Sequence, residues 1–112
     1  MPSFEQSAAK ALAFRDERDW KQFHNPKDLA LSISLEASEL LEVFQWSGTD
    51  LEVEGKRDQA ADELADVLIY CIYLADRLDV DPAEIVDAKI DADAAKYPVE
   101  KARGSAKKYN EL

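Results

Sequence analysis

The hydrophobic positions of this chain recur with the period of an α-helix in four separate segments. No segment shows the strict alternation that is typical of a half-buried β-strand. In the second segment, spacings of three or four residues place one set of side chains on a single helical face: Leu29, Ile33, Glu36, Leu40 and Phe44. The pattern predicts an all-α protein.

Capping signals mark the expected starts of three of the four helices. Ser3 with Gln6 forms a capping-box pattern, and Asn25-Pro26 and Asp81-Pro82 each combine a capping side chain with a proline that suits a first helical turn. The expected helices cover residues 3–18, 26–46, 57–78 and 82–97, and residues 98–112 are expected to form a basic, irregular tail. Short connections favour an antiparallel four-helix bundle, and residues 1–112 are interpreted as one domain.

The second half of the third helix, LADVLIYCIYLADRL, is apolar on almost every side. Such a helix should lie at the centre of the fold or in a subunit interface, so we expect an oligomer. The single cysteine, Cys71, lies in this run and is interpreted as part of the core. The run is too short to span a bilayer, which needs about 20 apolar residues. With no secretory signal evident, we expect a cytoplasmic protein without membrane partners.

Composition and charge narrow the possible partners. Hydrophobic residues make up 46% of the chain, which is typical of a globular domain. The net charge of −10 argues against nucleic-acid binding. From Lys96 onward, however, five basic residues face only two acidic ones. An acidic body with a basic tail suits a polyphosphate ligand that needs both a metal and ammonium groups, although a solubilising surface would give the same asymmetry.

Two acid pairs stand out because of their positions on the helices. Glu36 lies on the apolar stripe of the second helix, and Glu39 lies about 60° to one side of it. On the third helix, Glu63 and Asp66 share a face with Tyr70. Each of the two helices therefore carries two carboxylates at positions i and i+3, whose side chains stand roughly 5–6 Å apart.

Carboxylates on a core-facing stripe are costly unless a positive charge compensates them. No basic residue occupies the interior-facing positions near Glu36. Oxygen-only ligands suit a hard divalent cation, so we expect a Mg²⁺ site, with Mn²⁺ as a possible substitute. Acid pairs at this spacing are also common on exposed faces. The alternative hypothesis is a non-catalytic acidic helical module that binds a basic partner.

The two acid pairs read E-A-S-E (Glu36–Glu39) and E-L-A-D (Glu63–Asp66). This ExxE…ExxD pattern resembles the signature of the MazG-like all-α nucleoside triphosphate pyrophosphohydrolases. The segments ERDWKQFHNPKDLA, ELLEVFQW, DELADVLIYCIYLA and KYPVEKARGSAKKY together resemble the deoxycytidine-triphosphate pyrophosphatase branch of that family. The resemblance covers most of the chain from Glu17 to Tyr109.

The resemblance implies Mg²⁺-dependent hydrolysis of a deoxynucleoside triphosphate, dCTP being the leading candidate, to the monophosphate and pyrophosphate. By position, it implies four metal ligands: Glu36, Glu39, Glu63 and Asp66. Among these, Glu39 is our candidate for the base that acts on the attacking water, because it lies on the flank of the stripe. The implied assembly is a homotetramer built as a dimer of dimers, and the implied role is the clearing of unwanted nucleotides.

The resemblance also implies a set of substrate-binding residues: Trp20, His24, Trp46, Tyr70, Lys89, Asp93 and Lys96. The aromatic rings could stack on a base, and the lysines could contact phosphates. Asp93 departs from the family pattern, which has asparagine there. An ionised carboxylate only accepts hydrogen bonds, whereas an amide also donates them. The identity of the nucleotide base that the site prefers therefore stays open. A di-iron carboxylate bundle is excluded, because it needs two Glu-x-x-His pairs and His24 is the only histidine.

Overall fold

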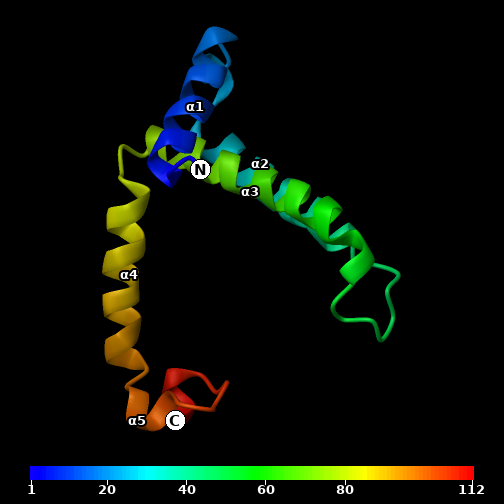
Figure 1. Cartoon of the computed structure of the whole chain (residues 1–112). Helices are drawn as coiled ribbons and strands as arrows, with labels where there is room; N and C mark the ends of the chain where they lie inside the picture. The colour runs from blue at the N-terminus through cyan, green and yellow to red at the C-terminus, as the bar shows by residue number, and fades with distance from the viewer. The chain divides into compact units, whose positions relative to one another are not determined.

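The computed structural model describes residues 1–112, and every regular element in it is helical (Figure 1). The α-helices are α1 (Phe4–Glu17), α2 (Pro26–Glu42), α3 (Arg57–Arg77), α4 (Pro82–Lys96) and the short α5 (Val99–Ala102). Three single 3₁₀ turns lie at Lys21–Phe23, Glu54–Lys56 and Tyr109–Glu111. The predicted all-α class is confirmed. No helix combines the length and the hydropathy that a membrane span requires.

The chain divides into two compact units, which are described separately. The first unit, Met1–Asp79, contains α1, α2 and α3, and the second, Val80–Leu112, contains α4 and α5. Within the first unit α3 contacts both α1 and α2, and α2 and α3 run side by side in opposite directions (Figure 1). The central position expected for the third helix is therefore observed in this unit. The closed four-helix bundle and the single domain over residues 1–112 stay predictions.

The helix starts follow the capping signals of the sequence. The Ser3 hydroxyl accepts a hydrogen bond from the Gln6 backbone N–H (3.1 Å), and the Gln6 side chain accepts one from the Ser3 backbone N–H (2.9 Å). At the starts of α2 and α4, the side chains of Asn25 and Asp81 accept hydrogen bonds from the backbone N–H groups of Asp28 and Ala83, and each capping residue is followed by proline. These side chains satisfy N–H groups that have no partner within the helix, which fixes where each helix begins.

Two helix ends differ from the expectation. The second helix was expected to end near Trp46, but α2 ends at Glu42. The next residues form tighter i→i−3 turns, such as the bond from the Phe44 N–H to the Leu41 carbonyl (2.9 Å). In the C-terminal tail, which was expected to be irregular, Val99–Ala102 forms one helical turn after Pro98. Proline favours the position before or at a helix start because its missing N–H has no role there.

The end of α1 fixes the position of Trp20. The Trp20 N–H donates to the Arg15 carbonyl (3.1 Å), and the Asp19 N–H donates to the Asp16 carbonyl (3.1 Å). Asp19 adopts the left-handed conformation with φ of 54°. These are the features of a Schellman motif, which commonly includes an apolar contact back onto the helix. Here that contact joins Trp20 to Phe14, whose ring centroids lie 5.7 Å apart.

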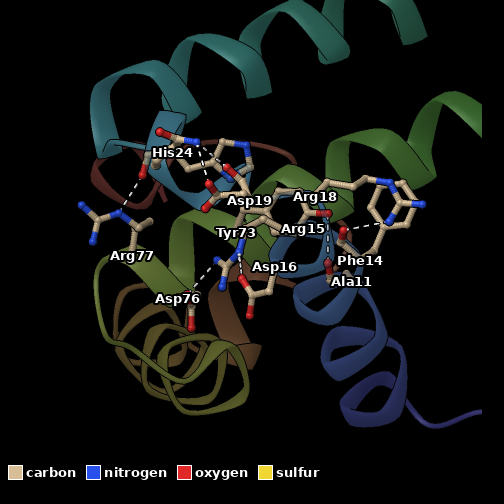
Figure 2. A network of polar contacts seen from close by, with 11 residues as sticks. Ala11, Phe14, Arg15, Asp16, Arg18, Asp19, His24, Tyr73, Asp76 and Arg77 are labelled. Atoms are coloured by element: carbon tan, nitrogen blue, oxygen red, sulfur yellow. Dashed lines mark hydrogen bonds and ion pairs between the residues drawn. The ribbon is translucent and has the colours of Figure 1, made fainter.

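A buried polar network attaches α1 to α3 (Figure 2). Arg15 is only 2% exposed and donates hydrogen bonds to Asp16 (2.9 Å) and Asp76 (2.8 Å). The Tyr73 hydroxyl donates to the Ala11 carbonyl (3.1 Å), and the Arg15 guanidinium lies 5.7 Å from the Tyr73 ring. The hydrogen bond from Arg15 lowers the pKa of Asp16. The network therefore fixes how α1 is oriented on α3.

Replacing Arg15 with methionine should destabilise the protein by about 1.5–3 kcal/mol, because charge-assisted hydrogen bonds are lost and Asp76 keeps no cationic partner. Urea unfolding followed by circular dichroism would measure the change. The matched control is Arg57→Met, since Arg57 pairs with Asp58 (3.7 Å) only at the surface and such pairs contribute little. Equal effects of the two substitutions would contradict the structural role of Arg15.

Several apolar side chains of the first unit remain exposed in the single chain. On α2 and α3 these are Leu31, Leu35, Leu41, Leu64 and Leu68, each between 45% and 67% exposed. Cys71 is also exposed, so its interpretation as core was wrong. The second half of α3 is apolar on almost every side, but α1 and α2 cover only part of it. The rest of its apolar surface is therefore exposed in the single chain.

Candidate metal centre and adjoining groove

Four carboxylates from α2 and α3 converge in the first unit. One oxygen from each lies within 4.8 Å of the others, and the four residues are Glu36, Glu39, Glu63 and Asp66. Each helix supplies a pair at i and i+3, so the two acid pairs face each other across the contact between the helices. We call this set the carboxylate quartet. The structure thus brings together the four residues that the sequence singled out.

The quartet is partly shielded from water. Glu36, Glu63 and Asp66 are half-buried, whereas Glu39 is exposed. The Oε2 atoms of Glu36 and Glu63 are buried and have no hydrogen-bond partner within the chain. A buried carboxylate oxygen without a partner is costly, and native structures usually provide one. Two such oxygens in one cluster indicate that a ligand from outside the chain belongs there.

The electrostatics of the quartet lead to the same conclusion. Burial raises the pKa of Glu36, and its interaction with the neighbouring Glu39 carboxyl raises it further. Burial also raises the pKa of Glu63, followed by the negative charges of Glu39 and Asp66. None of the chain's ion pairs involves a member of the quartet, so no cation of the protein offsets this repulsion.

The donor set fits a hard divalent cation. Carboxylate oxygens are the ligands that magnesium, manganese and calcium prefer, and four of them at this separation can share one or more ions. A bound cation would give the two unpartnered oxygens a partner and remove the repulsion that raises the two pKa values. The quartet is thus able to hold a divalent metal, and the ligand role of each residue stays a prediction.

A groove adjoins the quartet between α1 and α3. Its volume is about 630 Å³, which is within the usual range for small-molecule sites. Asp66 lines both the groove and the quartet, which makes the two features neighbours. Aromatic and aliphatic side chains form most of the remaining lining: Phe4, Phe14, Trp20, Leu68, Ile69, Tyr70, Ile72 and Tyr73. A flat organic group could lie in it next to a metal-bound anion.

Two of the expected nucleotide-contacting aromatic residues lie in this groove. Trp20 and Tyr70 both line it, although they come from different elements. His24 is not among the lining residues. Its ring lies 5.1 Å from the Tyr73 ring, its backbone carbonyl accepts a hydrogen bond from Arg77, and its Nδ1 is buried without a partner (Figure 2). Burial lowers the pKa of His24, which favours the neutral ring at pH 7.

The remaining expected site residues lie elsewhere. Trp46 is 87% exposed in the turn after α2 and does not line the groove. Lys89, Asp93 and Lys96 lie on α4, in the second unit. Lys89 Nζ lies 3.9 Å from Asp93 Oδ1, and the Lys96 ammonium lies 5.1 Å from the centroid of the Tyr109 ring. The contributions of these four residues to a substrate site stay predictions.

The part of the groove that α1 provides was not predicted from the sequence. Phe4, Ser7, Ala11 and Phe14 line it at spacings of three and four residues, and Lys10 lies beside them. This spacing is visible in the sequence as a helical stripe. It was overlooked because the stripe contains only two large apolar residues and its partner surface on α3 is not evident from the sequence.

Comparisons with known proteins agree with this geometry. Residues 31–112 match the MazG-like family. The chain is 40% identical to mouse dCTP pyrophosphatase 1 and 43% identical to the human protein, over 99% of this chain and 68% of each relative. It is also similar to the crystal structure of a pyrophosphatase from Archaeoglobus fulgidus, with 41% identity and a TM-score of 0.79. That match covers 88% of this chain and 94% of the other.

An all-helical fold with a carboxylate quartet beside an aromatic groove defines a candidate metal-dependent enzyme. The chain belongs to the MazG-like family, because the family match covers well over half of its length and the relatives align along nearly all of it. It is an enzyme of the nucleoside triphosphate pyrophosphohydrolase class. The resemblance inferred from the sequence is thereby confirmed.

Proposed function

We propose that this enzyme hydrolyses a deoxynucleoside triphosphate between the α and β phosphates, releasing the monophosphate and pyrophosphate. The leading candidate substrate is dCTP, the compound named in its mouse and human relatives. The observation that carries the proposal is the quartet, with its two buried, unpartnered oxygens next to a groove of nucleoside size. The quartet would hold Mg²⁺, with Mn²⁺ as a possible substitute.

When bound, magnesium would neutralise negative charge on the phosphate oxygens during hydrolysis. Glu36 and Glu63 would hold the ion through their buried oxygens, and Asp66 would do so at the junction with the groove. Glu39 is the exposed member of the quartet, so it is the one best placed to accept a proton from a water molecule that enters from solvent. We therefore propose Glu39 as both a ligand and the base.

The nucleoside would occupy the groove between α1 and α3. Trp20 and Tyr70 line it and offer aromatic faces to a base. We also propose that His24 and Trp46 contact the nucleotide, and that Lys89, Asp93 and Lys96 contribute to its binding in the assembled enzyme. Lys89 and Lys96 carry the positive charge that phosphates require.

Product analysis tests this function directly. The purified protein would be incubated with magnesium and each of the four standard dNTPs, together with modified cytidine triphosphates, and the products would be separated by ion-exchange chromatography. Equal amounts of monophosphate and pyrophosphate, with dCTP among the preferred substrates, would support the proposal. Release of orthophosphate would contradict cleavage between the α and β phosphates. No reaction with any triphosphate would favour the acidic interaction module instead.

Replacing Trp20 with alanine should raise KM for the triphosphate about 10- to 100-fold, because one stacking ring contributes roughly 1–3 kcal/mol. Steady-state kinetics would measure KM, and calorimetric titration would show that magnesium affinity is unchanged. Phe23→Ala is a suitable control, since Phe23 is an exposed aromatic residue nearby that does not line the groove. Parallel losses of nucleotide and magnesium affinity would indicate damage to the fold rather than loss of stacking.

The enzyme's assembly is also a proposal. The exposed leucines of α2 and α3 outside the groove, Leu31, Leu35, Leu41 and Leu64, form apolar surface that a single chain leaves in contact with water. We propose that copies of the chain cover this surface in a homotetramer arranged as a dimer of dimers, in a cytoplasmic setting. Light scattering coupled to size-exclusion chromatography would determine the mass. A monomer at micromolar concentration would contradict the assembly.

A further inference from the structure

Lys10 is the one basic residue among those that line the groove between α1 and α3. Its ammonium group makes no ion pair, and it takes part in none of the side-chain hydrogen bonds of the chain. The other lining groups are mostly apolar, and the one acid, Asp66, belongs to the quartet. An unpaired cation in a largely apolar groove is therefore available to a ligand.

The position of Lys10 along the groove indicates which part of a nucleotide it meets. Ala11, the next residue, accepts a hydrogen bond from Tyr73, so Lys10 lies near the level of Tyr73 on α3. Tyr73 follows Asp66 by seven residues, which is about 10 Å along a helix axis. Phosphates held at the quartet would lie at the Asp66 end of the groove. The base, which is the part of the nucleotide remote from the phosphates, would lie toward Lys10.

A base in the groove would meet aromatic side chains with its faces, which would leave its edge for Lys10. Phe14 and Trp20 contact each other at an interplanar angle of 74°, and together with Tyr70 they supply aromatic walls for the faces of a flat ring. Lys10 borders this stripe on α1, four residues before Phe14. A lysine ammonium donates hydrogen bonds and accepts none, so it requires an acceptor on the base edge.

The acceptors that a base offers depend on its identity. Cytosine, thymine, uracil and guanine each carry at least one carbonyl oxygen. Adenine carries none and presents an amino group that donates hydrogen bonds. An ammonium directed at the position of a carbonyl oxygen would therefore favour bases that carry one and disfavour adenine, whose only acceptors are ring nitrogens that lie closer to the ring centre than a carbonyl oxygen does.

We propose that Lys10 is a specificity-determining residue that donates a hydrogen bond to a carbonyl oxygen of the bound base. The inference rests on the proposed nucleotide function, which it deepens by naming the class of base that the groove selects. It assigns to Lys10 a role that depends on the base and not on the phosphates.

The test compares Lys10→Met with wild type for hydrolysis of dCTP and dATP in the presence of magnesium. The ratio of kcat/KM for dCTP to that for dATP should fall about 10- to 100-fold, mainly through KM for dCTP, because a base-edge contact of this kind typically discriminates by that factor. Lys10→Arg should keep most of the preference, since arginine also donates only. Lys27→Met removes an exposed lysine outside the groove and should leave the ratio unchanged.

A second measurement does not require metal or turnover. Calorimetric titration of the metal-free protein with dCMP and dAMP should show tighter binding of dCMP by wild type, and Lys10→Met should remove that difference. Equal losses for both nucleotides would mean that Lys10 contacts phosphate, and no loss would mean that it contacts neither, so either result overturns the inference. If wild type hydrolyses no triphosphate, the proposed function fails, while the dCMP and dAMP titrations still decide the role of Lys10.

Discussion

Replacing Asp66 with asparagine should lower kcat/KM by at least about 100-fold while leaving the helix content unchanged. Even residues that only orient metal ligands cost about 10- to 100-fold when mutated, and a ligand itself should cost more. Asparagine keeps the size of the side chain but loses the charge and one acceptor oxygen. Asp66 is also the one residue shared by the quartet and the groove, so both the metal and the nucleotide depend on it.

Asp62→Asn is the matched control for this experiment. Asp62 is exposed on the same helix, four residues before Asp66, and does not belong to the quartet. Its replacement changes the net charge by the same amount and should leave turnover within a few-fold of wild type. Circular dichroism and a thermal melt would confirm that both variants are folded. Near-native turnover in the Asp66 variant would show that the assignment of the ligands is wrong.

Replacing Glu36 with glutamine should stabilise the metal-free protein at pH 7 while abolishing its stabilisation by magnesium. The pKa of Glu36 is raised by burial and then by Glu39, so its ionised form is disfavoured in the folded state. A neutral amide removes that repulsion, and the melting temperature of the metal-free variant should rise by several degrees. Wild type at 100 times the magnesium dissociation constant should gain about 2.7 kcal/mol, a gain that the variant lacks.

The pH dependence of the stability of the metal-free protein tests the same role of Glu36. A carboxyl whose pKa is raised on folding binds more protons in the folded than in the unfolded state. The contribution of Glu36 and Glu63 to stability is therefore most favourable below their ordinary pKa and is lost as the pH rises through their raised values. Glu36→Gln should flatten this part of the profile. Glu42→Gln, an exposed position on α2, should leave it unchanged.

A destabilised Glu36 variant in the absence of metal would contradict this account. It would mean that Glu36 makes favourable interactions within the chain that outweigh the repulsion in the quartet. Thermal melts with and without magnesium, at pH 5 and pH 7, would separate the two possibilities. The predicted combination of higher stability and lost metal response is typical of residues whose charge serves function rather than folding.

The sequence predicted the local features of the fold well. Helix starts at Ser3, Asn25 and Asp81 agree with the structure, because a capping side chain and the N–H groups it satisfies lie within three residues of each other. The quartet was also predictable, since two i, i+3 acid pairs on amphipathic helices must meet if their apolar stripes pack together. Local spacing is sufficient for these predictions.

Features that depend on contacts between distant segments were not predictable in the same way. The groove lies between α1 and α3, which Arg15 connects through its bond to Asp76, 61 residues away, and no periodicity in the sequence reveals this pairing. The solvent exposure of Cys71 likewise depends on which sides of α3 other helices cover. Its apolar sequence neighbours predicted a buried position, but Cys71 is exposed. The helix α2 ends at Glu42 because the next residues form tighter turns. The apolar spacing continues through these turns, so the sequence predicted a longer helix.

Metal binding by the quartet can be tested with a crystal structure of the protein grown with manganese, whose anomalous signal locates the ion. An anomalous peak is expected among Glu36, Glu39, Glu63 and Asp66, with each carboxylate either coordinating the ion directly at about 2.0–2.3 Å or linked to it through one bound water. A peak at another place in the protein, or four carboxylates directed apart into solvent with no peak between them, would contradict it.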